Sequence, residues 1–226
     1  LLMGDPGTGK SVIKKAIKHN AEKRMVVVTV ARTLHTYTNT IKILCSAFNV
    51  DFSGTHFKCE KRLIEEALSL YRTGKMLVII IDDAQNLSLE SLELVRMISN
   101  LEAEQQKLVQ ILLIGQPELL THLSYGNLRQ LESRVIIREV VRPLSADELN
   151  YYLLFKLNSA GGSGRIRVTR RAVKKCHRIT GGNFRKVNIL MDRCLYVAFL
   201  NQKNDIDQRV IKAAHRDLAP DHRIFP

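Results

Sequence analysis

Apolar residues in the first part of the chain fall into short continuous runs, separated by stretches with helical spacing. The three longest runs cover residues 25–30, 76–81 and 109–114. Apolar positions three and four apart predict helices between them, including one over residues 88–104. Continuous apolar strands that alternate with helices are typical of a parallel sheet covered on both faces. The pattern therefore predicts an α/β fold.

The pattern changes near Pro143. A last strand-like run covers residues 135–141, and Pro143 ends it. Beyond it we find no strand of convincing length, and four segments have helical spacing, at residues 146–157, 170–179, 185–200 and 206–218. We therefore expect two domains, an α/β domain over residues 1–142 and a small all-helical domain over residues 143–226.

A glycine-rich loop at the start of the chain has the spacing G-x-x-x-x-G-K-[ST], with apolar residues before it and helical spacing after it. It consists of Gly4, Asp5, Pro6, Gly7, Thr8, Gly9, Lys10 and Ser11. Its glycines allow successive backbone N–H groups to form an anion site at the positive end of the next helix. Lys10 is then expected to reach the β- and γ-phosphates and Ser11 to hold Mg²⁺. The alternative is an accidental glycine-rich turn. Because the loop comes so early, we expect the chain to begin inside its first strand and to lack an upstream part with contacts to the nucleotide base.

Polar residues follow two of the apolar runs. Asp82 and Asp83 end one of them, and Gln116 ends the next. The carboxyl ends of parallel strands border the ligand crevice, so these side chains are expected beside the phosphates. Asp82 would hold Mg²⁺ through water, Asp83 would orient the attacking water, and Gln116 would bond the γ-phosphate or that water. Ordinary polar turns at strand ends are the alternative interpretation.

The composition shows that the chain is strongly basic. The chain has 35 Lys and Arg residues against 22 Asp and Glu, a net charge of +13. Residues 143–226 hold 16 of the basic and 7 of the acidic residues, so this part carries most of the excess. No apolar run is as long as a membrane span, and the beginning is not a signal peptide. The four scattered cysteines have no metal-site spacing and predict reduced, mostly buried thiols of a cytoplasmic protein.

Part of the basic excess lies on one face of a predicted helix. Five residues at helical spacing share that face: Arg170, Arg171, Lys174, Lys175 and Arg178. Like charges this close repel one another, so phosphates are a candidate ligand, in double-stranded DNA or on an anionic membrane. A solvated face without a ligand is the alternative.

The phosphate loop, the Asp-Asp strand end, the polar end of the next strand and the helical second part, in this order, resemble an AAA+ ATPase. Within that superfamily, five stretches look like the ExeA/GspA group of general secretion pathway ATPases, to which TniB- and TnsC-like transposition ATPases are related. They begin at Ile81, Leu113, Leu131, Arg142 and Gly181. The resemblance implies a P-loop NTPase sheet flanked by helices, with a small C-terminal helical lid.

The resemblance also implies roles for single residues. Gln116 matches sensor 1, Arg185 matches sensor 2, and Arg134 matches the arginine finger that completes a neighbouring subunit's site, so the active species would be an oligomer. Arg129 is a rival finger, and a structural salt bridge is the other interpretation of Arg134. Where the family usually has Glu, this chain has Asp83, one methylene shorter, which predicts a slow ATPase because catalysis is sensitive to misplacements of about 1 Å.

We therefore expect an ATP- and Mg²⁺-dependent ATPase that forms a homo-oligomer and assembles or remodels a cell-envelope secretion complex through a protein partner. Its place would be the cytoplasm, or the cytoplasmic side of a membrane protein whose anchor lies outside this chain. A DNA-binding ATPase that regulates transposition is one alternative, favoured by the basic helix. A nucleotide-gated scaffold with little hydrolysis is the other, favoured by Asp83.

Overall fold

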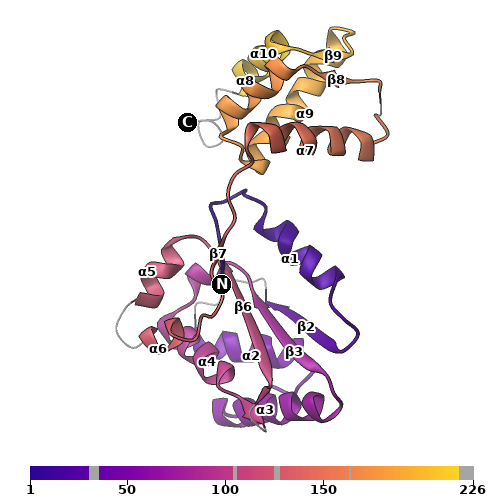
Figure 1. Cartoon of the computed structure of the whole chain (residues 1–226). Helices are drawn as coiled ribbons and strands as arrows, with labels where there is room; N and C mark the ends of the chain where they lie inside the picture. Colours follow the sequence, from indigo (N-terminus) through magenta and orange to yellow (C-terminus); the bar gives the residue numbers. More distant parts are fainter. Residues whose placement is uncertain (31–35, 104–105, 125–127, 163, 219–226) are drawn as a thin grey trace. The chain divides into compact units, whose positions relative to one another are not determined.

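The computed structural model describes residues 1–30, 36–103, 106–124, 128–162 and 164–218. Two compact units make up the chain (Figure 1). The first contains residues 1–6 and 10–141. The second contains Gly7–Gly9 and the residues from Arg142 onward.

The first unit is built on a five-stranded sheet in the order β2-β3-β6-β1-β7, with every neighbouring pair parallel. The strands are β1 (Leu2–Met3), β2 (Met25–Val30), β3 (Met76–Ile81), β6 (Val109–Gly115) and β7 (Glu139–Val140). Ile81 lies opposite Leu113, and Met3 lies opposite Gly115. The carboxyl ends of β1, β3 and β6 therefore meet at one edge.

Helices cover the sheet unequally. They are α1 (Lys10–His19), α2 (Tyr37–Ala47), α3 (His56–Arg72), α4 (Leu89–Ser99), α5 (Glu118–Ser124) and α6 (Arg129–Glu132), with a 3-10 turn η1 at Ala84–Asn86. On one face the buried strand residues Ile79 and Leu113 belong to a core with residues of α2 to α6. On the other face Leu2, Ile80 and Ile114 form a smaller core against Ile13 of α1 (Figure 1).

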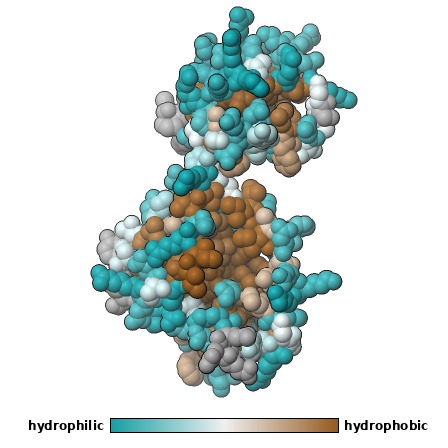
Figure 2. Space-filling view, viewed as in Figure 1, coloured by the Kyte–Doolittle hydropathy of each residue, from teal (hydrophilic) through white to brown (hydrophobic). Residues whose placement is uncertain are grey.

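Beside α1 this second face carries a groove. Its volume is about 630 Å³, and its lining includes Leu2, Ile13, Ile17, Ile111 and Ile137. Figure 2 shows a broad hydrophobic surface on this side of the first unit. Parallel sheets are normally covered on both faces, so the groove marks a stretch that no described residue covers.

Two expected elements are shorter than predicted. Helix α4 ends at Ser99 instead of continuing to residue 104, because the chain turns at Asn100 into a two-stranded antiparallel hairpin of β4 (Glu102–Ala103) and β5 (Gln106–Lys107). The run at residues 135–141 is a strand only at Glu139–Val140. The N–H groups of Glu139 and Val141 donate to the carbonyls of Leu1 and Met3, and the Leu1 ammonium donates to the Ile137 carbonyl at 2.8 Å.

The second unit is mainly helical. It contains α7 (Ala146–Ser159), α8 (Arg170–Thr180), α9 (Phe184–Leu200) and α10 (Gln208–Leu218). Its core includes Leu149, Val173, Cys194 and Ile211. A parallel pair of two-residue strands, β8 (Arg167–Val168) and β9 (Asp205–Ile206), was not predicted. These strands precede α8 and α10, so the two helices begin side by side.

All four cysteines are buried and unpaired, as predicted. Burial raises the pKa of Cys176 to about 11 and that of Cys194 to about 12, so both thiols stay protonated at neutral pH. Within the described ranges, no helix is both long and apolar enough to cross a membrane.

Gly182 provides a test of the second unit's packing. Its φ is +74°, and a Cβ at this position would overlap the carbonyl oxygen of Leu144, whose N–H donates to Gly182. Gly181 is also left-handed, at φ +60°, but a Cβ there would meet open space. We expect Gly182→Ala to lower the free energy of unfolding of this unit by about 2 to 5 kcal/mol and Gly181→Ala by about 1 kcal/mol, measured by urea denaturation. Equal losses for both variants would contradict the packing described for Gly182.

Candidate nucleotide-binding site

The glycine-rich loop connects β1 to α1. Gly7 and Gly9 have φ values of +82° and +101°, which favour glycine, and α1 begins at Lys10. The Gly4 N–H donates to the Gly115 carbonyl at 3.2 Å and thereby ties the loop to the end of β6. The Lys10 ammonium donates to the carbonyls of Gly4 at 2.5 Å and Asp5 at 2.9 Å. The loop thus has the strand, turn and helix context that phosphate binding requires.

The other loop residues differ in exposure. Thr8 is buried, with only 1% of its surface accessible. Asp5, Pro6 and Ser11 are exposed, and Ser11 lies in the first turn of α1. An exposed hydroxyl at the start of a helix is available to a metal ion or a phosphate.

Gly7–Gly9 and Arg185 belong to the same unit. The Arg185 N–H donates to the Gly7 carbonyl at 3.3 Å and to the side chain of Asn183, the N-cap of α9, at 3.1 Å. The backbone of the predicted sensor-2 residue therefore contacts the middle of the phosphate loop.

Asp82 follows β3 and forms an ion pair with Lys14 of α1. Its N–H donates to the Val30 carbonyl at 2.9 Å, so the position continues the β2–β3 ladder. The Asp82 and Lys14 side chains are only 13% and 18% exposed. The helix that follows the phosphate loop and the predicted metal ligand are therefore in direct contact, with a positive charge against the carboxylate.

Asp83 and Gln116 are connected through Gln85. Asp83 has the left-handed angles φ 52° and ψ 39°, which are uncommon for a residue other than glycine. The Gln85 side-chain amide donates to the Asp83 carboxylate at 3.5 Å, and its carbonyl oxygen accepts the Gln116 N–H at 3.0 Å. A Cβ at Gly115 would lie 2.9 Å from a Leu119 side-chain carbon and 3.0 Å from that oxygen, so these side chains would have to shift. One amide thus joins the two strand ends.

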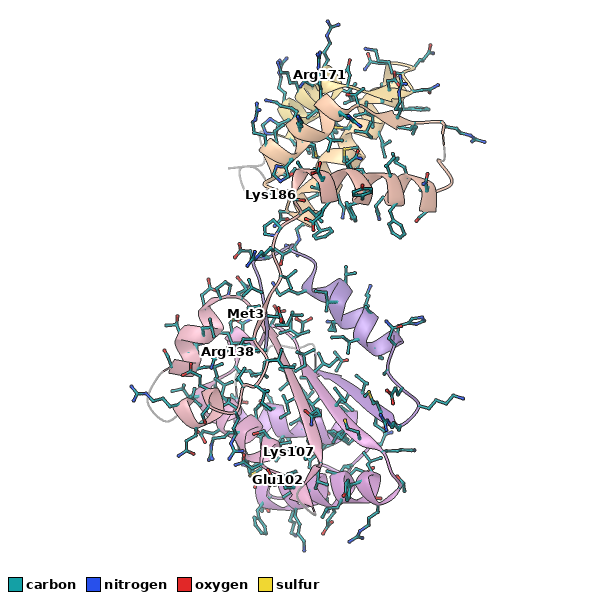
Figure 3. All side chains as sticks on the ribbon, in the orientation of Figure 1. Met3, Glu102, Lys107, Arg138, Arg171 and Lys186 are labelled. Carbon is teal, nitrogen blue, oxygen red and sulfur yellow. The ribbon has the colours of Figure 1, made fainter. Side chains whose placement is uncertain are left out.

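Arg134 lies away from this edge. It follows α6, is exposed, and lines the groove of the first unit. Its charge acts on the carboxyl group of Glu102, whose pKa is lowered mainly by Lys107 and to a smaller extent by Arg134. Figure 3 shows Glu102 and Lys107 near the start of β6. Among the residues that the structure describes, neither Arg134 nor Arg129 has an ion-pair partner, and the structural salt bridge considered for Arg134 is not observed.

The structure adds Lys14, which the sequence analysis did not include. It lies four residues after Lys10, so both lysines share one side of α1. This spacing was the available signal. The contact between Gln85 and Gln116 has no comparable signal, because it joins residues 31 positions apart.

Comparison with known proteins identifies similar sequences. A family model described as "AAA domain" matches residues 1–123. The chain is 32% identical over 208 residues to General secretion pathway protein A of Aeromonas hydrophila. This alignment covers 91% of this chain and 38% of that protein. The chain thus spans well under half of this relative's length.

Solved structures share the fold at low identity. Cdc6p from Pyrobaculum aerophilum superposes with a TM-score of 0.72 at 18% identity, over 96% of this chain and 59% of that one. The ADP form of the Aeropyrum pernix ORC2 protein gives 0.68 at 15% identity, over 94% and 60%. A RuvB mutant from Thermotoga maritima gives 0.65 at 15% identity, over 99% and 64%. By its family model the chain belongs to the AAA+ ATPases, and over most of its length it is similar to General secretion pathway protein A.

Proposed function

We propose that this AAA+ module binds ATP with Mg²⁺, hydrolyses it to ADP and phosphate between subunits of a homo-oligomer, and uses the cycle to assemble or remodel a cell-envelope secretion complex. The observation that carries the proposal is the contact between α1 and Asp82. Through it the helix that follows the phosphate loop and the strand-end carboxylate share one site.

The residues of this site fit the two ligands. The positive φ angles of Gly7 and Gly9 and the start of α1 suit a phosphate chain. Ser11 and Asp82 supply the hydroxyl and carboxylate oxygens that Mg²⁺ prefers, and Asp82 already holds a cationic group, the Lys14 ammonium. When bound, Mg²⁺ neutralises charge on the β- and γ-phosphates.

The protein's own groups have separate tasks in hydrolysis. Lys10 turns from the loop carbonyls to the β- and γ-phosphates, Asp83 orients the attacking water, and Gln116 bonds the γ-phosphate or that water. The Gln85 amide holds Asp83 and Gln116 in a fixed relation. Because the Asp83 side chain is short, we expect hydrolysis to be slow.

Arg134 supports action between subunits. The phosphate loop follows the carboxyl end of β1, whereas Arg134 acts on Glu102 near the amino end of the parallel strand β6. The seven-residue strand β6 places its amino and carboxyl ends about 20 Å apart. Arg134 therefore serves a neighbouring subunit's site in this proposal, and Arg185 contacts the γ-phosphate of its own.

The secretion role rests on the relative called General secretion pathway protein A, which is similar over most of this chain. We place the module in the cytoplasm or on the cytoplasmic side of a membrane protein, where ATP is available. A nucleotide-gated scaffold is a second candidate, because Asp83 departs from the family's usual Glu. ATP binding without turnover would favour the scaffold.

The first test measures ATP binding and the specific ATPase rate at several protein concentrations. We expect the rate per subunit to rise with concentration, because sites are completed between subunits. Lys10→Ala should weaken binding of a fluorescent ATP analogue at least about 100-fold, since charge-assisted phosphate contacts are lost. Lys15→Ala, on the exposed side of the same helix, is the control and should bind normally. Normal binding by the Lys10 variant would refute the site.

The second test concerns Arg134. We expect Arg134→Ala to bind ATP normally but to lose about 10³-fold or more in kcat, as for other arginine fingers. Mixing it with Asp83→Ala should restore part of the activity, because one subunit then supplies the arginine and the other the intact site. Arg129→Ala is the control. Loss of kcat in the Arg129 variant alone would assign the finger to that residue instead.

The third test concerns Lys14. Since Mg²⁺ held by Asp82 would compete with the Lys14 ammonium, we expect Lys14→Gln to lower the Mg²⁺ concentration needed for half-maximal binding of a fluorescent ATP analogue. A partly buried ion pair of this kind contributes about 1 kcal/mol, which corresponds to a roughly fivefold lower Mg²⁺ concentration in the variant. Lys15→Gln should leave this requirement unchanged. A higher requirement in Lys14→Gln would show instead that Lys14 assists binding.

A further inference from the structure

Helix α8 presents its charges to one side. Arg170, Arg171, Lys174 and Arg178 are exposed and Lys175 is half-buried, and the helix has no acidic residue. The opposite side, with Ala172, Val173 and Cys176, is buried in the core of the second unit. Figure 3 shows Arg171 at the outer side of α8. The basic side therefore faces solvent.

Helix α10 enlarges this surface. Because β8 and β9 pair directly before α8 and α10, the two helices begin side by side. The Gln208 side chain of α10 donates to the Arg171 carbonyl of α8 at 3.2 Å. Three residues of α10 share one exposed side: Arg209, Lys212 and Arg216. Val210, Ile211 and Ala214 form its buried side. We call the eight basic residues of α8 and α10 the α8–α10 basic surface.

Four acidic residues of the unit have partners outside this surface or in the backbone. Asp205 pairs with Arg167 at 2.8 Å, and Asp217 pairs with Arg193 at 2.9 Å. The Asp207 carboxylate accepts backbone N–H groups at the start of α10, and Glu148 belongs to a capping box. Within the described part of the chain, none of the eight basic side chains forms an ion pair. The charge of Arg209 contributes to lowering the pKa of Asp207, so α10 has some compensation, whereas α8 has no acidic residue of its own.

Fold stability does not account for such an arrangement. Basic residues in the first turn of a helix are unfavourable because the helix dipole is positive there. Helix α8 has Arg170 and Arg171 and no acidic residue in that turn, whereas the Asp207 carboxylate accepts the first N–H groups of α10. A polyanion would remove this cost, whereas water and salt only reduce it.

We propose that the α8–α10 basic surface binds the phosphate backbone of double-stranded DNA without sequence preference. An eleven-residue helix is about 16 Å long, and the same length of duplex carries roughly nine phosphate charges. The surface has no aromatic side chain for stacking on single strands and no base-reading motif, so the contact is to the backbone.

A membrane surface fits these observations less well. Folded modules that bind anionic membranes combine basic residues with apolar anchors. The large exposed apolar side chains of the second unit lie on α7 and α9 (Tyr151, Leu154, Phe155, Tyr196, Phe199 and Leu200), and α8 and α10 have none among their described residues. The surface therefore matches a phosphate polymer in water.

The test measures fluorescence anisotropy of a labelled duplex of about 25 base pairs, without nucleotide, between about 50 and 200 mM salt. The triple variant Arg170→Gln, Lys174→Gln, Arg178→Gln is compared with a control that loses the same charge from exposed positions of the first unit, Lys42→Gln, Lys58→Gln, Lys75→Gln. We expect at least tenfold weaker binding by the α8 variant and a salt slope smaller by about 2.7, with a much smaller change in the control. Two unrelated duplex sequences should bind alike.

The α8 variant should also melt at a higher temperature than the wild type, because repulsion is relieved. If the α8 variant fails to fold, a second triple variant on α10 tests the same surface: Arg209→Gln, Lys212→Gln, Arg216→Gln. Equal DNA affinity of either folded variant and the control would overturn the proposal, as would absence of binding by the wild type at low salt. Binding only to phosphatidylserine vesicles, lost in the α8 variant, would assign the surface to a membrane instead. Because no nucleotide is present, the result is independent of ATP hydrolysis.

Discussion

The parallel pairing of β1, β3 and β6 is the constraint on which the candidate site depends. In this register Met3 lies opposite Gly115 and Ile81 opposite Leu113. The next residues of each strand, which include Gly4, Asp82 and Gln116, therefore emerge at one edge of the sheet. A shift of one strand by two residues would move its polar end by about 7 Å and separate the groups that phosphate and metal binding require together.

The distribution of acidic residues divides the lysines and arginines into two kinds. Lys14 has a partly buried carboxylate partner, and this contact connects α1 to the end of β3. Arg167 and Arg193 have partners at the surface. The eight lysines and arginines of the α8–α10 basic surface form no ion pair within the described residues, so most of their charge is available to a ligand. Net charge alone does not separate these cases, since every lysine and arginine counts equally in it.

Membership of the AAA+ ATPases limits what the chemistry can be but leaves the partner open. The similar solved structures share the fold at 14 to 18% identity. Similarity at this level identifies the fold and does not identify a binding partner. Two other surfaces stand out among the described residues, the open groove beside α1, which Arg134 helps to line, and the α8–α10 basic surface. They differ in chemistry, because one is apolar and the other strongly cationic.

The sequence by itself determined the phosphate loop, the three long strands, the fold class and the helices of the second unit, because each depends on the spacing of nearby residues. It overestimated α4, which ends where the chain turns into a hairpin, and the strand at residues 135–141, which pairs with β1 only at Glu139–Val140. Only the tertiary structure decided the Lys14 contact with Asp82, the Gln85 contact with Gln116, and the position of α10 beside α8. These contacts join residues far apart in the chain, so local periodicity carries no information about them.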